Sequence, residues 1–455
     1  MTTARSREDM TSVQEILGAD RGSAAPAPFR ETSTRSFGLA EIPVERYISA
    51  EYARLEHDRL WSRVWQWACN EEDIPEVGAQ TVYDIGDRSA LIVRTGPDSF
   101  KAYRNACLHR ARQLREGPGS SATITCGFHG WSWNLDGSLH DIPCRWDFPQ
   151  VSDADFALPE VRLERWAGFI FVNFDPDAGP LTDALDVIPE HFADFPLERK
   201  FTAAHVSKRV PANWKAAMEA FLESYHTVRT HPQILGVTGD ANTQYDVWEN
   251  VSRLYTPFGV PSPHLPDLDA DDVFEQGVEF FTQGAGTAPA RDPDTPPRAG
   301  LAAVLRGMLG GALGAELAAD LAAASDAEVL DGVQYFVFPN WFPWAGVVNG
   351  IQYRFRPDGF DPHTSILDIR LMLPLPPGDQ RPPAAAHRML ADDEPFGSVA
   401  ELGNLGPLFD QDESNLRAVQ RGMRITGRTG LVLGDYQESR IRHFHQLLER
   451  WVEGS

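Results

Sequence analysis

Short runs of alternating apolar and polar residues follow one another between about residues 80 and 175. They are TVYDI (81–85), SALIVRT (89–95), SFKAYRN (99–105), SATITC (121–126), WSWNLDGSL (131–139) and GFIFVNF (168–174). A period of two predicts β-strands, and the Gly-Asp and Gly-Pro-Asp sequences between the first three runs are typical of turns. We therefore expect a small all-β domain in this part of the chain.

The apolar pattern has a longer period on both sides of this region. Residues 41–67 show helical spacing of apolar side chains, and residues 205–214 predict a strand that leads into a helix. Further strands are expected at 334–346, 350–357 and 365–375, and helices near 299–324, 410–426 and 436–452. Because strands and helices are segregated rather than alternating, the fold class is α+β, with a second, antiparallel sheet. Residues 256–298 are too long for a simple connector and predict, with the helix after them, a lid or subunit-contact region.

The length of 455 residues allows two hydrophobic cores. We expect an N-terminal segment (1–58) packed on the larger domain, the β domain at 59–176, and the larger domain at 177–455. A formal charge of −24 argues against nucleic acid as a partner. No secretory segment opens the chain, and no uncharged apolar run approaches the roughly 18 residues of a membrane span. The chain has four cysteines, two of which belong to candidate metal-binding motifs, and the other two are too few for a disulfide scaffold, so a cytoplasmic location is expected.

Two Cys/His pairs lie inside the predicted β domain. Cys107 and His109 form the first pair, and Cys126 and His129 form the second. Four such ligands could bind zinc in a tetrahedral site. A Rieske [2Fe–2S] centre needs the same mixture, with two thiolates on one iron and two imidazoles on the other. The mixture of one Cys and one His in each pair favours the Rieske centre.

The stretch 213–232, NWKAAMEAFLESYHTVRTHP, gathers two carboxylates and two imidazoles. Glu219, Glu223 and His226 would share one face of a straight helix. His231 is about 500° of rotation beyond His226, so the helix must widen or end between them if both are to bind one ion. Two histidines with one carboxylate are typical of non-heme iron sites, although an amphipathic helix with incidental polar residues has the same pattern. The acid could be Glu219, Glu223 or a distant Asp. The remaining histidines lack paired spacing and are expected to be structural.

The motifs NACLHR (105–110), CGFHGWSWNLDGSL (126–139) and NWK followed by ExxxExxHxxxxH resemble the large (alpha) subunit of Rieske non-heme iron ring-hydroxylating oxygenases. The resemblance covers roughly residues 40–450. It implies a [2Fe–2S] cluster and a mononuclear Fe(II), and a catalytic domain of the helix-grip type. Glycine stands at position 127 where many relatives have proline. Glu223 stands where most relatives have aspartate, which affects the expected bridging geometry and the reaction type.

In the resembled family the third iron ligand is an Asp near the C-terminus, in a stretch like FDQDESNLRAVQRG (409–422). Asp412 lies on the expected buried stripe of this helix, together with Leu416, Val419 and Met423. Asp410 and Glu413 are expected on other faces. A carboxylate that points inward is costly unless it is paired or binds metal, so Asp412 is the predicted ligand, with Asp410 as the alternative. An acid favoured by the dipole at the helix N-terminus is the other interpretation of Asp412.

The family implies that Glu223 hydrogen-bonds His226 and a Rieske histidine, His129, of a neighbouring subunit, and so connects the two metals. It also implies a terminal oxygenase that takes electrons from a separate ferredoxin or reductase and forms a homotrimer, with or without small β subunits. Three functions compete at this point. The first is aromatic ring hydroxylation with dioxygen, as in aromatic hydrocarbon catabolism. The second is a monooxygenase or demethylase acting on a C–H, O-methyl or N-methyl group, and the third is a non-catalytic electron carrier.

Overall fold

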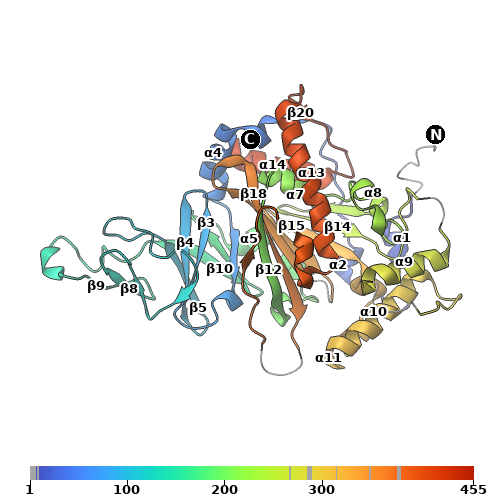
Figure 1. The fold of residues 1–455 in the computed structure, drawn as a ribbon, viewed down its shortest axis with the longest axis horizontal. Helices are drawn as coiled ribbons and strands as arrows, with labels where there is room; N and C mark the ends of the chain where they lie inside the picture. Colours follow the sequence, from blue (N-terminus) through green and yellow to red (C-terminus); the bar gives the residue numbers. More distant parts are fainter. Residues whose placement is uncertain are drawn as a thin grey trace. The chain divides into compact units, whose positions relative to one another are not determined.

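The computed structural model describes residues 7, 10–265, 268–283, 289–313, 315–347, 350–376 and 381–454. The chain forms two compact units. Unit 1 comprises residues 1–52, 185–356 and 361–455, and unit 2 comprises residues 53–184 and 357–360. Strands form large sheets in both units and helices are concentrated in unit 1, which confirms the predicted α+β class (Figure 1).

Unit 2 contains a seven-stranded sheet and a three-stranded sheet. The larger sheet has, in spatial order, β2 (Gln66–Asn70), β11 (Phe169–Asn173), β10 (Glu160–Trp166), β5 (Ser99–Arg104), β4 (Arg88–Gly96), β3 (Ala79–Ile85) and β6 (Gly119–Ser120). The smaller sheet has β7 (Thr123–Thr125), β8 (Ser132–Asn134) and β9 (Leu139–Asp141). All the neighbouring strands pair in an antiparallel manner. The core between the sheets includes Leu91, Tyr103, Trp131, Trp133 and both cysteines of the Cys/His pairs, Cys107 and Cys126.

Two expectations for the first half of the chain were wrong. The run 131–139 is a hairpin of β8 and β9 rather than one strand. The predicted helix over 41–67 is interrupted at Ser49, which is extended and whose hydroxyl accepts a hydrogen bond from the Tyr52 amide at 3.1 Å. Such a side-chain acceptor caps a new helix and stops continuation of the old one. The helix is therefore divided into α3 (Glu45–Ile48) and α4 (Ala50–Glu56), which continues as a π-helical turn, and β2 begins at Gln66.

Unit 1 is built on an eight-stranded sheet. Its strands are, in spatial order, β13 (Gln244–Val247), β14 (Val251–Thr256), β15 (Gly332–Val337), β16 (Trp341–Ala345), β17 (Ile351–Asp358), β18 (Asp361–Pro374), β12 (Lys200–Val210) and β19 (Arg388–Met389). The longest pair is β12 with β18, which runs antiparallel from Lys200 opposite Pro374 to Val210 opposite Ser365. A separate short pair joins β1 (Ile42–Pro43) to β20 (Gly430–Leu431).

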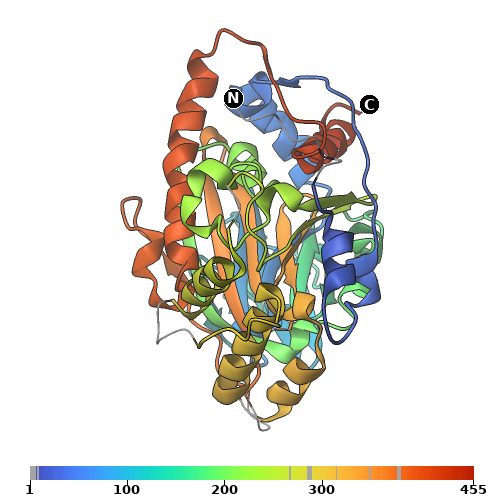
Figure 2. The same ribbon diagram turned by 90° about the vertical axis from the view of Figure 1, so that its right-hand side faces the viewer.

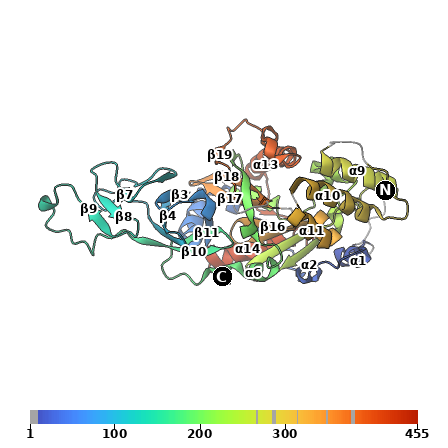
Figure 3. The same cartoon turned by 90° about the horizontal axis from the view of Figure 1, so that it is seen from below.

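Helices of unit 1 cover this sheet and extend from one end of it. Besides α3, they are α1 (Val13–Ala19), α2 (Ala27–Arg30), α6 (Ile188–His191), α7 (Trp214–Glu219), α8 (Thr227–Thr230), α9 (Ala270–Thr282), α10 (Pro297–Leu313), α11 (Ala315–Ala323), α12 (Asp326–Leu330), α13 (Leu405–Ile425) and α14 (Ser439–Val452). A further short helix, α5 (Leu181–Leu185), lies where unit 2 ends. Figure 2 shows the long helix α13 beside the strands, where it packs on α7 and β12. Helices α9, α10 and α11 gather at one end of the unit (Figure 3). No helix in the described ranges is long and apolar enough to cross a bilayer.

The predicted helix over 299–324 is also divided. Helix α10 continues through Gly310 and Gly311, and α11 packs against it. A Cβ at Gly310 would lie 3.1 Å from the Cβ of Ala318. The small residues therefore permit the close approach of two helices where the sequence predicted a single helix.

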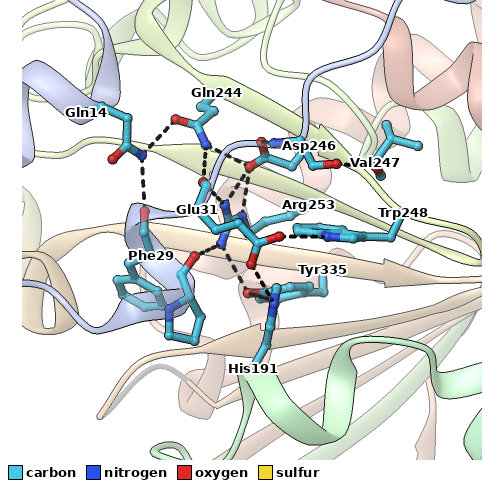
Figure 4. A network of polar contacts seen from close by, with 12 residues as sticks. Gln14, Phe29, Glu31, His191, Gln244, Asp246, Val247, Trp248, Arg253 and Tyr335 are labelled. Atoms are coloured by element: carbon cyan, nitrogen blue, oxygen red, sulfur yellow. Dashed lines mark hydrogen bonds and ion pairs between the residues drawn. The ribbon is translucent and has the colours of Figure 1, made fainter.

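An N-terminal arm, residues 27–33, is attached to the sheet by a buried ion pair (Figure 4). Arg253 on β14 pairs with Asp246 on β13 at 2.6 Å, and the guanidinium also donates to the carbonyl oxygens of Pro28 and Glu31. Asp246 in turn accepts from the amide of Ser33 at 2.7 Å. Because both charges are fully buried and mutually paired, the arm and the two strands form one connected polar network.

Candidate active site

The segment between Asn213 and Pro232 changes from helix to irregular backbone near its middle. Asn213 caps α7 by accepting from the Lys215 amide, but the helix ends at Glu219. The Tyr245 hydroxyl then accepts from the Ser224 amide at 3.0 Å, which gives this amide a partner outside any helix. The prediction that Glu219, Glu223 and His226 share one helix face was therefore wrong.

The two histidines lie at the two ends of the short helix α8. His226 precedes its first residue, and His231 follows its last residue with φ −122° and ψ 54°, outside the helical region. Pro232 is the next residue, and it disfavours a helical conformation at His231. The helix thus ends between the two imidazoles, as their spacing required, and the ring centroids lie 5.2 Å apart.

Asp412 on α13 lies against both imidazoles. Its Oδ1 is 3.0 Å from His231 Nε2 and 3.5 Å from His226 Nε2. All three potential ligand atoms lie within 4.8 Å of one another. Asp412 and His231 are buried, and His226 is partly buried. The structure therefore brings together the three residues that the sequence predicted as iron ligands, and the geometry suits one small cation.

Each imidazole is oriented through its other nitrogen. Glu223 Oε1 lies 2.6 Å from His226 Nδ1, and its Oε2 accepts from the His226 amide at 3.0 Å. Gln411 Oε1 lies 2.7 Å from His231 Nδ1. An acceptor at Nδ1 holds the proton there and leaves the Nε2 lone pair available to a metal. Sequence reasoning missed Gln411, because nothing in the sequence relates it to His231.

The electrostatics of this site favour a cation. Burial lowers the pKa of His226, but the hydrogen bond to Glu223 and the charges of Glu223 and Asp412 raise it to about 9. Two carboxylates therefore surround two imidazoles in a largely buried space, and a proton is retained in the absence of another cation. This donor set, two nitrogens and one oxygen, fits a divalent iron.

The Asp410 alternative lies elsewhere on α13. Asp410 accepts from the backbone amides of Phe396 at 2.6 Å and Gly397 at 2.9 Å, and does not reach the histidines. The buried stripe of α13 also differs in part from the prediction, because Val419 is exposed and Gln420 is buried. Glu413, expected on a polar face, pairs with the buried Lys208 at 2.5 Å.

Glu219 belongs to a separate buried network. Its Oε1 lies 2.8 Å from both the Tyr47 hydroxyl and His445 Nε2. Arg46 Nη1 is 3.3 Å from His445 Nδ1 and can only donate, which places the histidine proton on Nε2. Glu219 is therefore an acceptor for two neutral donors, Tyr47 and His445, and not for His226 or His231.

The two Cys/His pairs lie on two facing loops of unit 2. The rings of His109 and His129 are 4.7 Å apart at their centroids, and Cys107 and Cys126 are close enough to share a hydrogen bond. Each loop is closed by a backbone hydrogen bond. The Ala111 amide donates to the Cys107 carbonyl at 3.0 Å, and the Gly130 amide donates to the Cys126 carbonyl at 3.1 Å.

The chemistry of these loops fits an iron–sulfur cluster. His109 Nδ1 is buried and has no hydrogen-bond partner among the described residues, as expected for an atom that needs a metal. Burial raises the pKa of the Cys126 thiol, but backbone amides of Phe128 and His129 and the contact with Cys107 lower it below its usual value. Backbone N–H groups directed at sulfur stabilise thiolate ligands. Trp131 stacks on the His109 ring at 5.0 Å and covers it from one side.

A second group of potential metal ligands was missed by the sequence. His205 on β12, Asp368 on β18 and His387 have ligand atoms within 4.8 Å of one another. However, Arg354 and Arg356 each donate to Asp368 Oδ2 at 2.8 Å, and Ser207 donates to Oδ1. Asp368 is thus already neutralised by two guanidinium groups, which would repel a metal ion. Asp368 is therefore the buried centre of an ion-pair cluster.

Two family models match this chain. Residues 191–454 match the family model "Ring hydroxylating alpha subunit (catalytic domain)", and residues 64–152 match "Rieske [2Fe-2S] domain". The carnitine monooxygenase oxygenase subunit of Escherichia coli (strain K12) is 28% identical over 276 residues, which cover 58% of this chain and 70% of that protein. The chlorobenzene dioxygenase subunit alpha of Cupriavidus sp. (strain PS12) is 29% identical over 192 residues, or 40% of this chain and 42% of that protein.

Solved structures show the same fold. A quaternary ammonium Rieske monooxygenase in complex with L-carnitine superposes with a TM-score of 0.63 at 17% identity, over 91% of this chain and 96% of that one. Naphthalene 1,2-dioxygenase with indole bound gives a TM-score of 0.60 at 16% identity, over 92% and 93%. Both units of the chain are therefore included in the structural likeness.

Proposed function

Because the chain belongs to the ring-hydroxylating oxygenase alpha-subunit family and carries its Rieske [2Fe–2S] domain, we propose that this terminal oxygenase component hydroxylates an aromatic or similarly apolar substrate with dioxygen. The observation that supports this most is the convergence of His226, His231 and Asp412 in a buried site. When bound, the cluster supplies electrons and the mononuclear Fe(II) supplies open coordination positions for dioxygen. We propose the domain limits 1–58, 59–176 and 177–455 for the N-terminal segment, the Rieske domain and the catalytic domain.

The roles of the ligands follow from the donor atoms. Cys107 and Cys126 would hold one iron of the cluster, and His109 and His129 the other, because thiolates and imidazoles divide in this way in Rieske centres. His226, His231 and Asp412 would hold the mononuclear iron through Nε2, Nε2 and a carboxylate oxygen. Glu223 and Gln411 would keep the Nδ1 protons in place and so fix both rings.

An aromatic wall next to the ligands supports an apolar substrate. The Phe221 ring lies 5.2 Å from the Tyr353 ring, 5.0 Å from the Phe355 ring and 5.8 Å from the Phe409 ring, centroid to centroid. Phe409 is one helical turn before Asp412 on α13. Rings of this kind exclude water and bind apolar groups, which suits oxidation of an unactivated carbon.

We also propose the partners that the family implies. A ferredoxin or reductase would donate the electrons, and a homotrimer, with or without small β subunits, would place His129 of one copy near Glu223 of the next. Glu223 is suited to this position because it already holds His226 by a 2.6 Å hydrogen bond. A cytoplasmic location remains part of the proposal.

Monooxygenation, including demethylation at an N-methyl or O-methyl group, is the second candidate. It is supported by the match to carnitine monooxygenase oxygenase subunits, and by the glutamate at position 223. Turnover under labelled dioxygen with a reconstituted electron donor distinguishes the two. Incorporation of both labelled oxygen atoms into one product molecule indicates a ring dioxygenase, and incorporation of one labelled atom indicates a monooxygenase. Release of unlabelled product without oxygen uptake would contradict both.

A further inference from the structure

A buried arginine, Arg440, is linked through Gln334 to Tyr353 of the aromatic wall, and none of its hydrogen-bond acceptors is a carboxylate. Arg440 is the second residue of α14 and its side chain is fully buried. Its Nε donates to the Ser252 hydroxyl at 3.0 Å, and its Nη1 donates to Gln334 Oε1 at 3.0 Å and to the Leu222 carbonyl at 3.4 Å. Its Nη2 is buried and has no partner among the described residues. All three acceptors are neutral.

Two other buried arginines of this unit, Arg253 and Arg298, are paired with carboxylates. Arg253 pairs with Asp246 at 2.6 Å, and Arg298 pairs with Asp331 at 2.6 Å and Asp20 at 2.7 Å. Burial lowers the pKa of Arg440 to about 9, and distant acidic groups only partly oppose this. A buried guanidinium without a counter-ion is costly to the protein, so its presence calls for a negative partner.

The groups around Arg440 also have a surplus of donors. Because Gln334 Oε1 accepts from Arg440, its Nε2 is free to donate, and it donates to the Tyr353 hydroxyl oxygen at 2.8 Å. Trp344 Nε1 donates to the same oxygen at 2.9 Å. The Tyr353 oxygen thus accepts two hydrogen bonds, and its own proton has no acceptor in the described part of the chain. Burial and the charge of Asp412 both raise the pKa of Tyr353, so this proton is retained at neutral pH.

These donors adjoin the proposed substrate site. The Tyr353 ring is part of the aromatic wall, 5.2 Å from Phe221 and 6.1 Å from Phe409. The Leu222 carbonyl that Arg440 contacts immediately precedes Glu223. The guanidinium has no accessible surface, so bulk solvent does not reach it in this structure.

We propose that Arg440 and the Tyr353 hydroxyl form the anion-binding end of the substrate site, and that the substrate carries a carboxylate on an apolar body. The inference rests on the proposed function. A carboxylate accepts two hydrogen bonds from separate donors and neutralises the guanidinium, and the apolar body then lies between this end and the iron ligands. Arg440 is in this role a specificity-determining residue.

The test compares carboxylic acids with their primary amides, which have nearly the same shape but no charge. Benzoate and benzamide, 3-phenylpropionate and its amide, and γ-butyrobetaine and its amide are titrated into the anaerobic holoenzyme by calorimetry. At least one acid is expected to bind roughly 10- to 100-fold more tightly than its amide, as for other charge-assisted hydrogen bonds. Arg440→Gln should abolish this ratio, and Arg440→Lys should restore part of it.

Arg442→Gln is the matched control. Arg442 lies on the same helix and is buried, but it donates to the backbone carbonyls of Gly434, Ala40 and Leu433. Its substitution should lower stability and keep the acid-to-amide ratio. Equal binding of every acid and its amide, binding of no acid, or an unchanged ratio in Arg440→Gln would overturn the proposal. The wild-type ratio needs no variant, so it remains decisive if Arg440→Gln does not fold.

Dioxygen consumption distinguishes a failure of the anion-binding end from a failure of the proposed oxygenase function. An iron-loaded protein that consumes dioxygen with neutral substrates only would contradict the anion-binding end and leave the oxygenase intact. An iron-loaded, reducible protein that consumes no dioxygen with any probe would contradict the oxygenase itself.

Discussion

Glu223→Gln isolates the contribution of one charge to the iron site. The amide has nearly the same size as the carboxylate, so the packing around His226 is preserved. Glu223 makes two hydrogen bonds to His226, at 2.6 Å to Nδ1 and 3.0 Å to the backbone amide. The glutamine can accept only one of these through oxygen, and it has no charge to polarise the imidazole.

The expected loss of Fe(II) affinity follows from the free energy that such hydrogen bonds contribute. A hydrogen bond to a charged group contributes about 1.5–3 kcal/mol, which corresponds to roughly 10- to 150-fold in a binding constant. Substitution of residues that orient a metal ligand usually costs about 10- to 100-fold in affinity. Because the Glu223 side chain is only 9% exposed, little of the interaction is screened by water. We therefore expect Fe(II) to bind about 30-fold more weakly in Glu223→Gln.

The assay is an anaerobic Fe(II) titration in competition with a chelator, after removal of the mononuclear iron. The visible spectrum of the cluster serves as an internal check that unit 2 is unchanged. Glu219→Gln is the matched control, because Glu219 is also buried but contacts Tyr47 and His445 instead of a ligand. An Fe(II) affinity within twofold of wild type for Glu223→Gln, or an equal loss in Glu219→Gln, would show that the Glu223 charge does not support the iron site.

Three further predictions concern other parts of the structure. Gln411→Leu removes the acceptor at His231 Nδ1 and should weaken Fe(II) binding about tenfold in the same titration; unchanged affinity would contradict this role. Asp368→Asn removes the negative charge that Arg354 and Arg356 contact, and should lower the free energy of unfolding by about 3–5 kcal/mol in urea, with iron content unchanged. The two arginines beside buried Asp368 hold the pKa of that carboxyl well below its usual value. The wild-type protein should therefore lose this stabilisation only as the pH falls below about 4. An acid unfolding transition that is the same in Asp368→Asn as in wild type would contradict this prediction. Trp131→Ala opens one side of His109 and should shorten the lifetime of the cluster absorbance in air; an unchanged lifetime would show that the ring gives no protection.

Most ligands of the two expected iron sites could be predicted from the sequence because they lie close together within short motifs. The Cys/His pairs and the His226–His231 spacing each lie within a short stretch, and the structure places both histidines beside Asp412. The α+β class followed from apolar periodicity and is confirmed. The helix-face argument for Glu219 and Glu223 was wrong, because it assumed a helix that tertiary contacts such as the Tyr245 hydroxyl to the Ser224 amide interrupt.

Residues that contact a site from a distant helix could not be recognised from their neighbours in the sequence. Gln411 follows His231 by 180 positions, and Arg440 lies 218 positions beyond Leu222. Each becomes meaningful only when the helix that bears it is packed against the segment that it contacts. The buried face of α13 shows the same limitation on a smaller scale, since Gln420 is buried by its contacts with Asn213 and the Tyr47 carbonyl while Val419 is exposed.

Metal analysis of matched variants shows whether one chain holds two separate iron centres. Wild-type protein purified without added metal should contain about three irons per chain, two in the cluster and one mononuclear. His226→Ala should lose about one iron and keep the Rieske spectrum, and Cys107→Ala should lose the spectrum and about two irons. Zinc in place of iron in wild type, or an unchanged iron content in His226→Ala, would contradict the account.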